Sequence, residues 1–201
     1  LLVAIGVKGC IESLGLNNIG LKTMNHSILT NQYGETSVKG IYAIGDVTKA
    51  PCLAHKASHQ GIMVAELISG KKINKILKEE DIPGCTYSNP QIASIGLTEE
   101  QAKKQGYSLN IGNFPFTANG KALALGEENG FIKTIFDKKT GELLGAHMVG
   151  AEVTELISTY IVGKGLEITP EEFVSNIFPH PTMSEMLYES VLSSEGKAIH
   201  F

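Results

Sequence analysis

Two apolar runs joined by a short polar segment constrain the fold more than any other feature of this chain. Residues 131–136 (FIKTIF) and 143–149 (LLGAHMV) are rich in apolar and β-branched side chains, and the polar segment between them contains a glycine. A parallel pair would need a crossover of about a dozen residues or more, so strands joined this closely pair antiparallel. The sequence therefore predicts an antiparallel hairpin over residues 131–149.

Helix signals lie on either side of this hairpin. Thr98 and Gln101 have capping-box spacing at the start of a short helix. After the hairpin, apolar residues recur with helical spacing over residues 153–161, and Thr169 and Pro170 then fit the cap and the first residue of another helix. We therefore predict an α+β fold in which helices flank an antiparallel sheet.

The composition is typical of a globular protein and argues against two kinds of partner. Hydrophobic residues make up 42% of the 201 residues, enough for a core. No apolar run approaches the ~20 residues that span a bilayer, so we expect no membrane partner. The formal net charge of -4 argues against a nucleic-acid partner.

Cysteine and arginine usage indicates the compartment. The three cysteines are dispersed at positions 10, 52 and 85, so they form neither a close dithiol nor a metal-binding set, and they suit a reducing compartment. Every basic residue is lysine, which disfavours a site for a 2′-phosphate. Since arginine-free, Lys-, Asn- and Ile-rich usage hints at an AT-rich genome, we expect a bacterial cytoplasm, with a mitochondrial matrix as the alternative.

His180 and Glu185 are the main candidates for catalysis. A carboxylate bound to one imidazole nitrogen fixes the tautomer and raises the basicity of the other, which makes a general base. A second interpretation stays open, because Thr182 followed by Glu185 also fits a capping box before an apolar helix. Three other histidines have no motif beside them: His26, His59 and His200.

A second motif lies far upstream. Residues 41–47 (IYAIGDV) read as a buried parallel strand that ends in Gly-Asp, and open α/β sheets place ligands at that end. An apolar helix follows residues 51–57 (PCLAHKA), and the backbone N–H groups at its start, around Ala54 and His55, offer partial positive charge. Taken alone, Asp46 also fits an ordinary turn residue or helix cap.

Together the two motifs resemble the flavoprotein disulfide reductases, or pyridine nucleotide-disulfide oxidoreductases, and within them the C-terminal part of the dihydrolipoyl dehydrogenases. Residues 88–99 (SNPQIASIGLTE) and 144–150 (LGAHMVG) are similar to the family's interface domain. The Leu-Ala-His-Lys-Ala run is similar to the lipoamide branch of the family rather than to the glutathione branch.

The resemblance implies roles for both motifs. Asp46 would hold the ribityl chain of FAD, and His180, oriented by Glu185, would take a proton from a substrate thiol. Gly6 would approach the nicotinamide nucleotide of NAD, although the family's usual Gly-Arg-x-Pro reads Gly-Val-Lys-Gly here. Four consecutive residues would lie beside the flavin ring: Cys52, Leu53, Ala54 and His55.

The resemblance also divides the chain into three parts. Residues 1–26 would end the NAD-binding domain, residues 27–81 would be the C-terminal segment of the FAD-binding domain, and residues 82–201 would form the dimerisation domain. Only remnants of the two α/β domains would then be present. No glycine-rich phosphate loop occurs, and residues 1–6 read as a buried strand that needs neighbours on both sides. We therefore expect a fragment of a larger enzyme.

The implied activity is oxidation of protein-bound dihydrolipoamide to lipoamide, with electrons passing through a disulfide and FAD to NAD. The implied partners are a second copy of the chain, in a homodimer, and the lipoyl domains of 2-oxoacid dehydrogenase or glycine cleavage complexes. Two alternatives stay open. One is another flavin disulfide reductase of the glutathione type, and the other is a non-catalytic dimerisation module.

Overall fold

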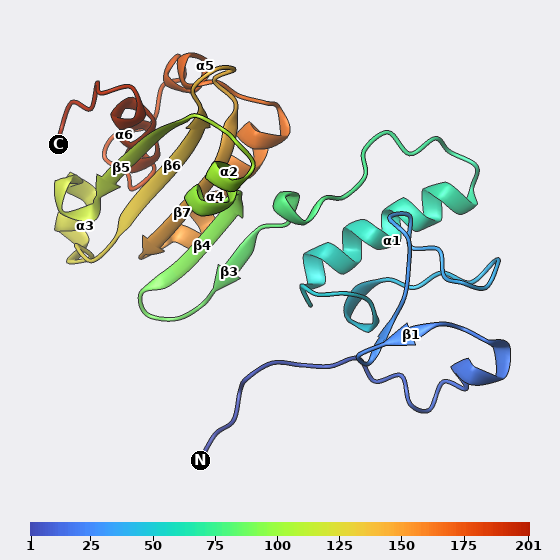
Figure 1. Ribbon diagram of the computed structural model, residues 1–201. Helices are drawn as coiled ribbons and strands as arrows, with labels where there is room; N and C mark the ends of the chain where they lie inside the picture. The colour runs from blue at the N-terminus through green and yellow to red at the C-terminus, as the bar shows by residue number, and fades with distance from the viewer. The chain divides into compact units, whose positions relative to one another are not determined.

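The computed structural model describes residues 1–201, which divide into two compact units, residues 1–78 and residues 79–201 (Figure 1). The second unit is built on a five-stranded antiparallel sheet with the strand order β3-β4-β7-β6-β5. The strands are β3 (Gly84–Thr86), β4 (Gln91–Gly96), β5 (Leu109–Pro115), β6 (Phe131–Asp137) and β7 (Leu143–Gly150). This confirms the predicted α+β fold with an antiparallel sheet.

The predicted hairpin lies inside this sheet. β6 and β7 pair antiparallel, with Phe131 opposite Val149 and Lys133 opposite His147. β5 pairs with the outer edge of β6, and β4 pairs with the outer edge of β7. Both hairpin strands are therefore hydrogen-bonded along both edges, and their side chains are buried on both faces of the sheet, which explains why their apolar runs are nearly continuous.

Five helices complete the second unit, and both of the capping boxes expected before them at Thr98 and Thr169 are present. The Thr98 hydroxyl accepts the N–H of Gln101 at 3.2 Å, and the Gln101 side chain accepts the N–H of Thr98 at 2.9 Å. Thr169 and Glu172 make the same reciprocal pair. The helices are α2 (Glu99–Lys104), α3 (Gly120–Leu125), α4 (Val153–Gly165), α5 (Pro170–Val174) and α6 (Glu185–Ser194), and the short 3-10 turns are η3 (Glu79–Asp81) and η4 (Phe116–Ala118).

The main core lies between the sheet and the helices α4 and α6. Ile132 and Phe136 of β6 are fully buried in the cluster that these two helices share. Ile135 belongs instead to a smaller cluster with Ala102 of α2. The sheet is therefore covered by apolar side chains on both faces, with the larger helices on one face and α2 on the other.

Helix α6 is fixed against its neighbours by close packing and by buried hydrogen bonds. A Cβ atom at Gly112 of β5 would lie 1.8 Å from the carbonyl oxygen of Ser190, so only glycine leaves room for the helix. The hydroxyls of Ser190 and Thr134 lie 3.1 Å apart. The Tyr160 hydroxyl of α4 donates to the carbonyl oxygen of Leu187 at 3.0 Å, and burial raises the pKa of Tyr160, which keeps this donor protonated.

The first unit contains much less regular structure. Its helix α1 (Ala54–Ile68) confirms the helix predicted after the Gly-Asp motif, and its other elements are η1 (Leu16–Ile19), β1 (Thr23–Met24), β2 (Ser27–Ile28) and η2 (Gly45–Val47). Its buried apolar cluster is small and consists of Leu21, Ile28 and Ala43.

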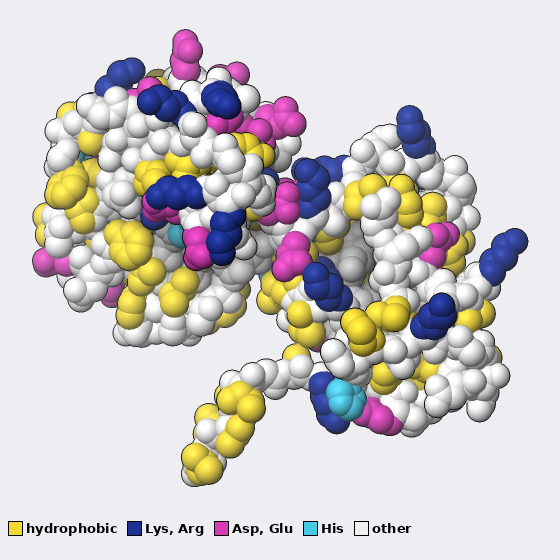
Figure 2. All heavy atoms as spheres, viewed as in Figure 1, with side chains coloured by type: hydrophobic (Ala, Val, Ile, Leu, Met, Phe, Trp, Pro, Cys, Tyr) yellow, Lys and Arg dark blue, Asp and Glu magenta, His cyan; other side chains and the backbone are white.

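Two strands predicted in the first unit are absent, so those predictions are wrong. Residues 1–6 form no strand and are exposed, and Figure 2 shows hydrophobic side chains along this extended segment. Residues 41–45 form no parallel strand, and Tyr42 makes only a single antiparallel bridge, to Glu35. A parallel strand takes its hydrogen bonds from neighbouring strands, and the two short strands of this unit pair only with each other.

The longest helix of the chain is α1, with 15 residues. None of the helices combines the length and the apolar character that crossing a membrane would require.

Candidate active site

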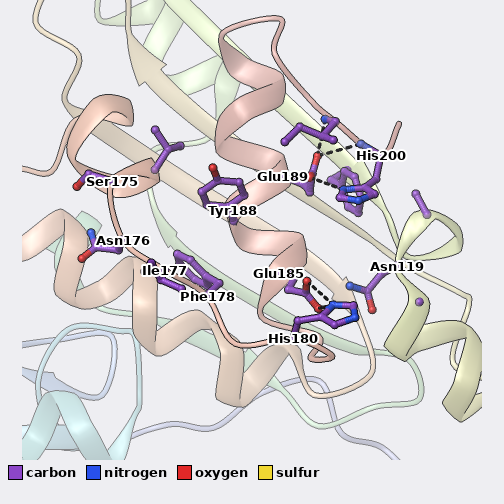
Figure 3. Close-up of a pocket in the computed structure, with 15 residues that line it drawn as sticks. Asn119, Ser175, Asn176, Ile177, Phe178, His180, Glu185, Tyr188, Glu189 and His200 are labelled. Atoms are coloured by element: carbon purple, nitrogen blue, oxygen red, sulfur yellow. Dashed lines mark hydrogen bonds and ion pairs between the residues drawn. The ribbon is translucent and has the colours of Figure 1, made fainter.

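The loop between α5 and α6 brings His180 against Glu185, the first residue of α6 (Figure 3). Nδ1 of His180 lies 2.9 Å from Oε1 and 3.2 Å from Oε2 of the glutamate. A carboxylate only accepts hydrogen bonds, so Nδ1 carries the proton of the neutral ring and Nε2 keeps its lone pair. The His180 side chain is 78% exposed, so this lone pair is accessible from outside the fold.

Glu185 has a second partner, which tests the capping-box interpretation of the motif. Its Oε2 accepts the backbone N–H of Thr182 at 2.9 Å, which is one half of a capping box. The Thr182 hydroxyl instead donates to the carbonyl oxygen of Pro179 at 2.7 Å, and Ser184 is the residue that precedes the helix. The prediction of a full capping box is therefore wrong. Glu185 binds both a backbone N–H and the imidazole.

Glu185 presents an ionised carboxylate to the His180 ring. Partial burial raises the pKa of this carboxyl group, but the N–H of Thr182 and the His180 ring lower it by more, so the pKa lies below its usual value. Glu185 is therefore ionised at neutral pH and stabilises positive charge on the imidazole. This geometry can accept a proton at Nε2 and hold it.

A cavity of about 520 Å³ opens beside this pair. Its polar side chains include a second histidine–carboxylate pair, His200 and Glu189, which Figure 3 shows one helical turn along α6 from the first. The rest of the lining is largely apolar and includes Phe114, Val174, Ile177, Phe178, Tyr188 and Ile199.

The expectation that His200 lacks a constellation is wrong. Its Nδ1 donates to Oε1 of Glu189 at 2.7 Å. Sequence reasoning missed this pair because the two residues lie 11 positions apart and meet only after the chain has turned back at the end of α6. The signal that could have found it is Gly196, a helix-ending glycine followed by a further histidine.

The flavin motif lies in the first unit. Asp46 is in η2 with an exposed carboxylate that makes no hydrogen bond within the chain. Leu53 precedes α1 and has no side-chain oxygen to cap it. An open carboxylate next to a helix start without a side-chain cap fits a ligand that carries hydroxyl donors and an electron-rich ring, so these residues fit FAD.

Hydrogen bonds fasten the loop around Asp46 to helix α1. The side-chain oxygen of Gln60 accepts the N–H of Gly45 at 2.9 Å. The buried Lys56 ammonium donates to the carbonyl oxygens of Lys49 and Pro51. The segment that precedes α1 therefore has a fixed backbone, and its four predicted ring neighbours, Cys52, Leu53, Ala54 and His55, lie in and directly before the first turn of the helix.

Gly6 stands apart from this arrangement. It lies in the exposed N-terminal segment with φ of +139°, and a Cβ atom built on it would meet nothing within 4 Å. The predicted FAD residues thus lie in η2 and at the start of α1, whereas Gly6 lies in neither element.

Two family descriptions match the sequence. Residues 82–191 match the pyridine nucleotide-disulphide oxidoreductase dimerisation domain, and residues 1–61 match the domain described as pyridine nucleotide-disulphide oxidoreductase.

Curated relatives agree with this match. The dihydrolipoyl dehydrogenase of Zymomonas mobilis is 56% identical over 200 residues, which are 100% of this chain and 43% of that protein. The dihydrolipoyl dehydrogenase of Bacillus subtilis is 46% identical over 201 residues, which are 100% of this chain and 42% of that protein. The chain thus spans less than half the length of these relatives.

Solved structures share the fold. LpdA from Mycobacterium tuberculosis has a TM-score of 0.88 at 24% identity, over 94% of this chain and 41% of that one. The HOCl-induced flavoprotein disulfide reductase RclA from Escherichia coli has a TM-score of 0.85 at 25% identity, over 95% of this chain and 44% of that one.

Proposed function

Because the chain belongs to the pyridine nucleotide-disulphide oxidoreductase family, we propose that it is the C-terminal part of a dihydrolipoyl dehydrogenase. The observation that carries this proposal is the 2.9 Å contact between His180 Nδ1 and Glu185 Oε1, with the other ring nitrogen accessible. The relatives from Z. mobilis and B. subtilis support the choice of reaction, since both are named dihydrolipoyl dehydrogenase.

In the proposed reaction, Nε2 of His180 takes the proton of one thiol of dihydrolipoamide, because the thiolate is the species that attacks a disulfide. The thiolate attacks an enzyme disulfide, and the second substrate sulfur then attacks the mixed disulfide. Lipoamide forms with its S–S bond as the enzyme disulfide is reduced to one thiol and one thiolate. The substrate's two protons pass to His180 and to one released enzyme thiolate.

Glu185 acts on this step through the imidazole. Its ionised carboxylate stabilises the imidazolium that forms when the thiol loses its proton, and it holds the ring in the tautomer that leaves Nε2 open. The thiols of this chain, Cys10, Cys52 and Cys85, are free and dispersed, so the enzyme disulfide would come from another part of the complete protein.

We assign the flavin contacts to the first unit. Asp46 would accept hydrogen bonds from the ribityl hydroxyls, and Cys52, Leu53, Ala54 and His55 would lie beside the flavin ring. FAD supplies the acceptor for two electrons, which pass on to NAD. Gly6 would contact the nicotinamide nucleotide. We keep the proposed division into residues 1–26, 27–81 and 82–201 for the NAD-binding, FAD-binding and dimerisation parts.

The proposed assembly is a homodimer, and the match of residues 82–191 to a dimerisation domain supports it. Its substrate-bearing partners would be lipoyl domains of 2-oxoacid dehydrogenase or glycine cleavage complexes. The bacterial relatives support a bacterial cytoplasm as the location.

A second candidate is a flavin disulfide reductase that acts on another disulfide. The fold shared with the E. coli flavoprotein disulfide reductase RclA favours keeping this alternative. The third reading, a non-catalytic dimerisation module, needs no role for the His180–Glu185 pair.

The deciding experiment uses the complete protein that contains this chain, purified with its cofactors. NAD reduction is followed with dihydrolipoamide, and reduction of glutathione disulfide is followed with NADH in a parallel assay. We expect turnover with dihydrolipoamide and none with glutathione disulfide. The reverse pattern would favour the second candidate, and no turnover in either assay by a flavin-loaded dimer would favour the non-catalytic module.

A further inference from the structure

A buried carboxylate on α6 has no part in the chemistry proposed above. Glu189 is only 4% exposed, although the other buried residues of this helix are apolar or small: Met186, Leu187, Ser190, Val191 and Leu192. A buried carboxylate is costly unless hydrogen bonds replace the water that it has lost. Its partners therefore indicate what it does.

All the partners of Glu189 come from residues near the C-terminal end of the chain. Its Oε2 accepts the backbone N–H of Ile199 at 2.9 Å and that of His200 at 3.4 Å. Its Oε1 accepts the ring N–H of His200 at 2.7 Å. One side chain thus holds two consecutive backbone groups and one imidazole of what we call the tail segment, residues 197–201.

The local sequence explains how the tail segment reaches Glu189. Gly196 follows α6 in the left-handed conformation, with φ of +68°. Its N–H bonds to the carbonyl oxygen of Ser193 at 3.0 Å, and the N–H of Lys197 bonds to that of Leu192 at 2.9 Å. These two bonds form a Schellman motif, which reverses the chain so that the tail segment runs back beside the helix.

The tail segment is part of the wall of the cavity that contains His180. Ile199 and His200 line this cavity together with His180 and Glu185. The ring of Phe201 packs edge-on against Phe114, another residue of the lining, with ring centroids 6.2 Å apart. The position of this wall therefore depends on what holds the tail segment in place.

We propose that Glu189 is a positioning residue that holds the tail segment against α6 as one wall of the His180 cavity, and that this wall helps to bind the dihydrolipoamide arm. The second half of this statement rests on the proposed function. Glu185 and Glu189 then share one helix face with different tasks. The first orients the base, and the second shapes the space in which the base meets its substrate.

The first arm of the test measures hydrogen exchange of single amides by NMR in the 201-residue chain. In Glu189→Gln, we expect the amides of Ile199 and His200 to exchange at least about tenfold faster, because a neutral amide oxygen accepts more weakly than a carboxylate and the new NH2 group cannot accept the ring N–H of His200. Glu195→Gln is the matched control, since Glu195 follows the same helix but binds Asn110 and not the tail segment. Unchanged exchange in Glu189→Gln, with circular dichroism showing an intact fold, would overturn the proposal.

The second arm measures KM and kcat for dihydrolipoamide in the complete enzyme. We expect Glu189→Gln to raise KM by about tenfold and to change kcat by less than about twofold, because the base itself is untouched. A fall in kcat at constant KM would contradict a role in shaping the cavity.

A double-mutant cycle shows whether Glu189 acts through the tail segment. Deletion of residues 198–201 should raise KM like Glu189→Gln, and the two changes together should raise it no further. Additive effects would overturn the proposal. A wild-type enzyme without dihydrolipoamide turnover would overturn the proposed function alone, and the exchange arm would still decide whether Glu189 holds the tail segment.

Discussion

The two compact units differ in how many apolar side chains they bury. In the second unit, the sheet strands and α4 and α6 bury one continuous cluster that contains Phe136, Met148 and Leu187. In the first unit, only a few apolar residues are buried, while Leu1, Ile5, Ile62 and Ile68 are exposed. The second unit thus contains both sides of its own core, whereas the apolar surface of the first would need to be covered by other parts of the proposed enzyme.

This difference also separates the proposed tasks of the two units. The second unit holds the His180–Glu185 pair on a helix that is locked to the sheet. The first unit holds Asp46 on a loop that is hydrogen-bonded to α1. We expect changes in the second unit to affect the chemistry and the fold, and changes in the first unit to affect mainly the cofactor.

The largest expected effect is on catalysis in the second unit. His180→Gln in the complete enzyme should lower kcat for dihydrolipoamide by about 10²–10⁴-fold, because a positioned general base contributes about that much. Flavin content and dimer mass should not change. The Glu185→Gln enzyme is the companion variant, with a smaller loss, since the amide still accepts the N–H of Thr182. Wild-type activity in His180→Gln would remove the assigned base.

Core substitutions in the two units should differ in their effect on stability. Phe136→Ala empties a fully buried site of the second unit and should lower the free energy of unfolding by about 3–5 kcal/mol. Ile68→Ala removes an exposed side chain of the first unit and should change it by less than about 0.5 kcal/mol. Urea titrations of the 201-residue chain followed by circular dichroism measure both. Equal losses of unfolding free energy in the two variants would contradict the proposed difference between the units.

Flavin retention tests the first unit alone. In the complete enzyme, Asp46→Ala should weaken FAD binding by about tenfold or more, because hydrogen bonds to a charged group contribute about 1.5–3 kcal/mol each. Glu66→Ala is the control, because Glu66 is an acid on α1 of the same unit that forms an ion pair with Lys71 at 3.5 Å. Flavin absorbance after dialysis measures how much FAD each variant retains. Equal retention in both variants would show that Asp46 is an ordinary turn residue.

The smallest expected effect is a change in the stability of the second unit at acidic pH. Glu99 contacts Lys103 and Lys133, each at 2.5 Å, and these lysines lower the pKa of Glu99 from 4.5 to about 2. Because the pKa in the folded state is the lower one, the stabilisation is present above pH 4.5 and is lost as the pH falls towards 2. The difference in thermal stability between wild type and Glu99→Gln should therefore shrink over this range.

Glu100 offers the matched control for that measurement. It lies beside Glu99 on α2 and pairs only with Lys104, at 2.7 Å, where both side chains are exposed. Glu100→Gln should therefore match wild type at every pH. A difference between Glu99→Gln and wild type that stays constant from pH 6 to pH 2 would contradict the role of the two lysines.

The sequence was sufficient to predict features whose partners are close along the chain. The hairpin of β6 and β7, the caps at Thr98 and Thr169, and the pairing of His180 with Glu185 all depend on residues at most 18 positions apart. Local hydrogen bonds and periodicity determine such features, so their patterns can be recognised without a structure.

Features that depend on distant surfaces were not predictable. The buried strand expected in residues 1–6 and the parallel strand expected in residues 41–47 are absent, because the first unit offers no strand that could pair with them. The His200–Glu189 pair was missed because it requires the reversal at Gly196, which brings the tail segment back to α6. An apolar run indicates that a segment can be buried, but it does not indicate which other segment will pack against it.

The close approach at Gly112 limits which substitutions this site can accept during evolution. A methyl group there would push α6 away from β5, and the same helix begins with the carboxylate that orients His180. A library randomised at position 112 and selected for activity should return glycine almost alone. The same selection at Leu123, which is half exposed on α3, should return many residues. Adaptive change near this site is therefore confined to the loops and helix faces around α6, while its contact with the sheet stays invariant.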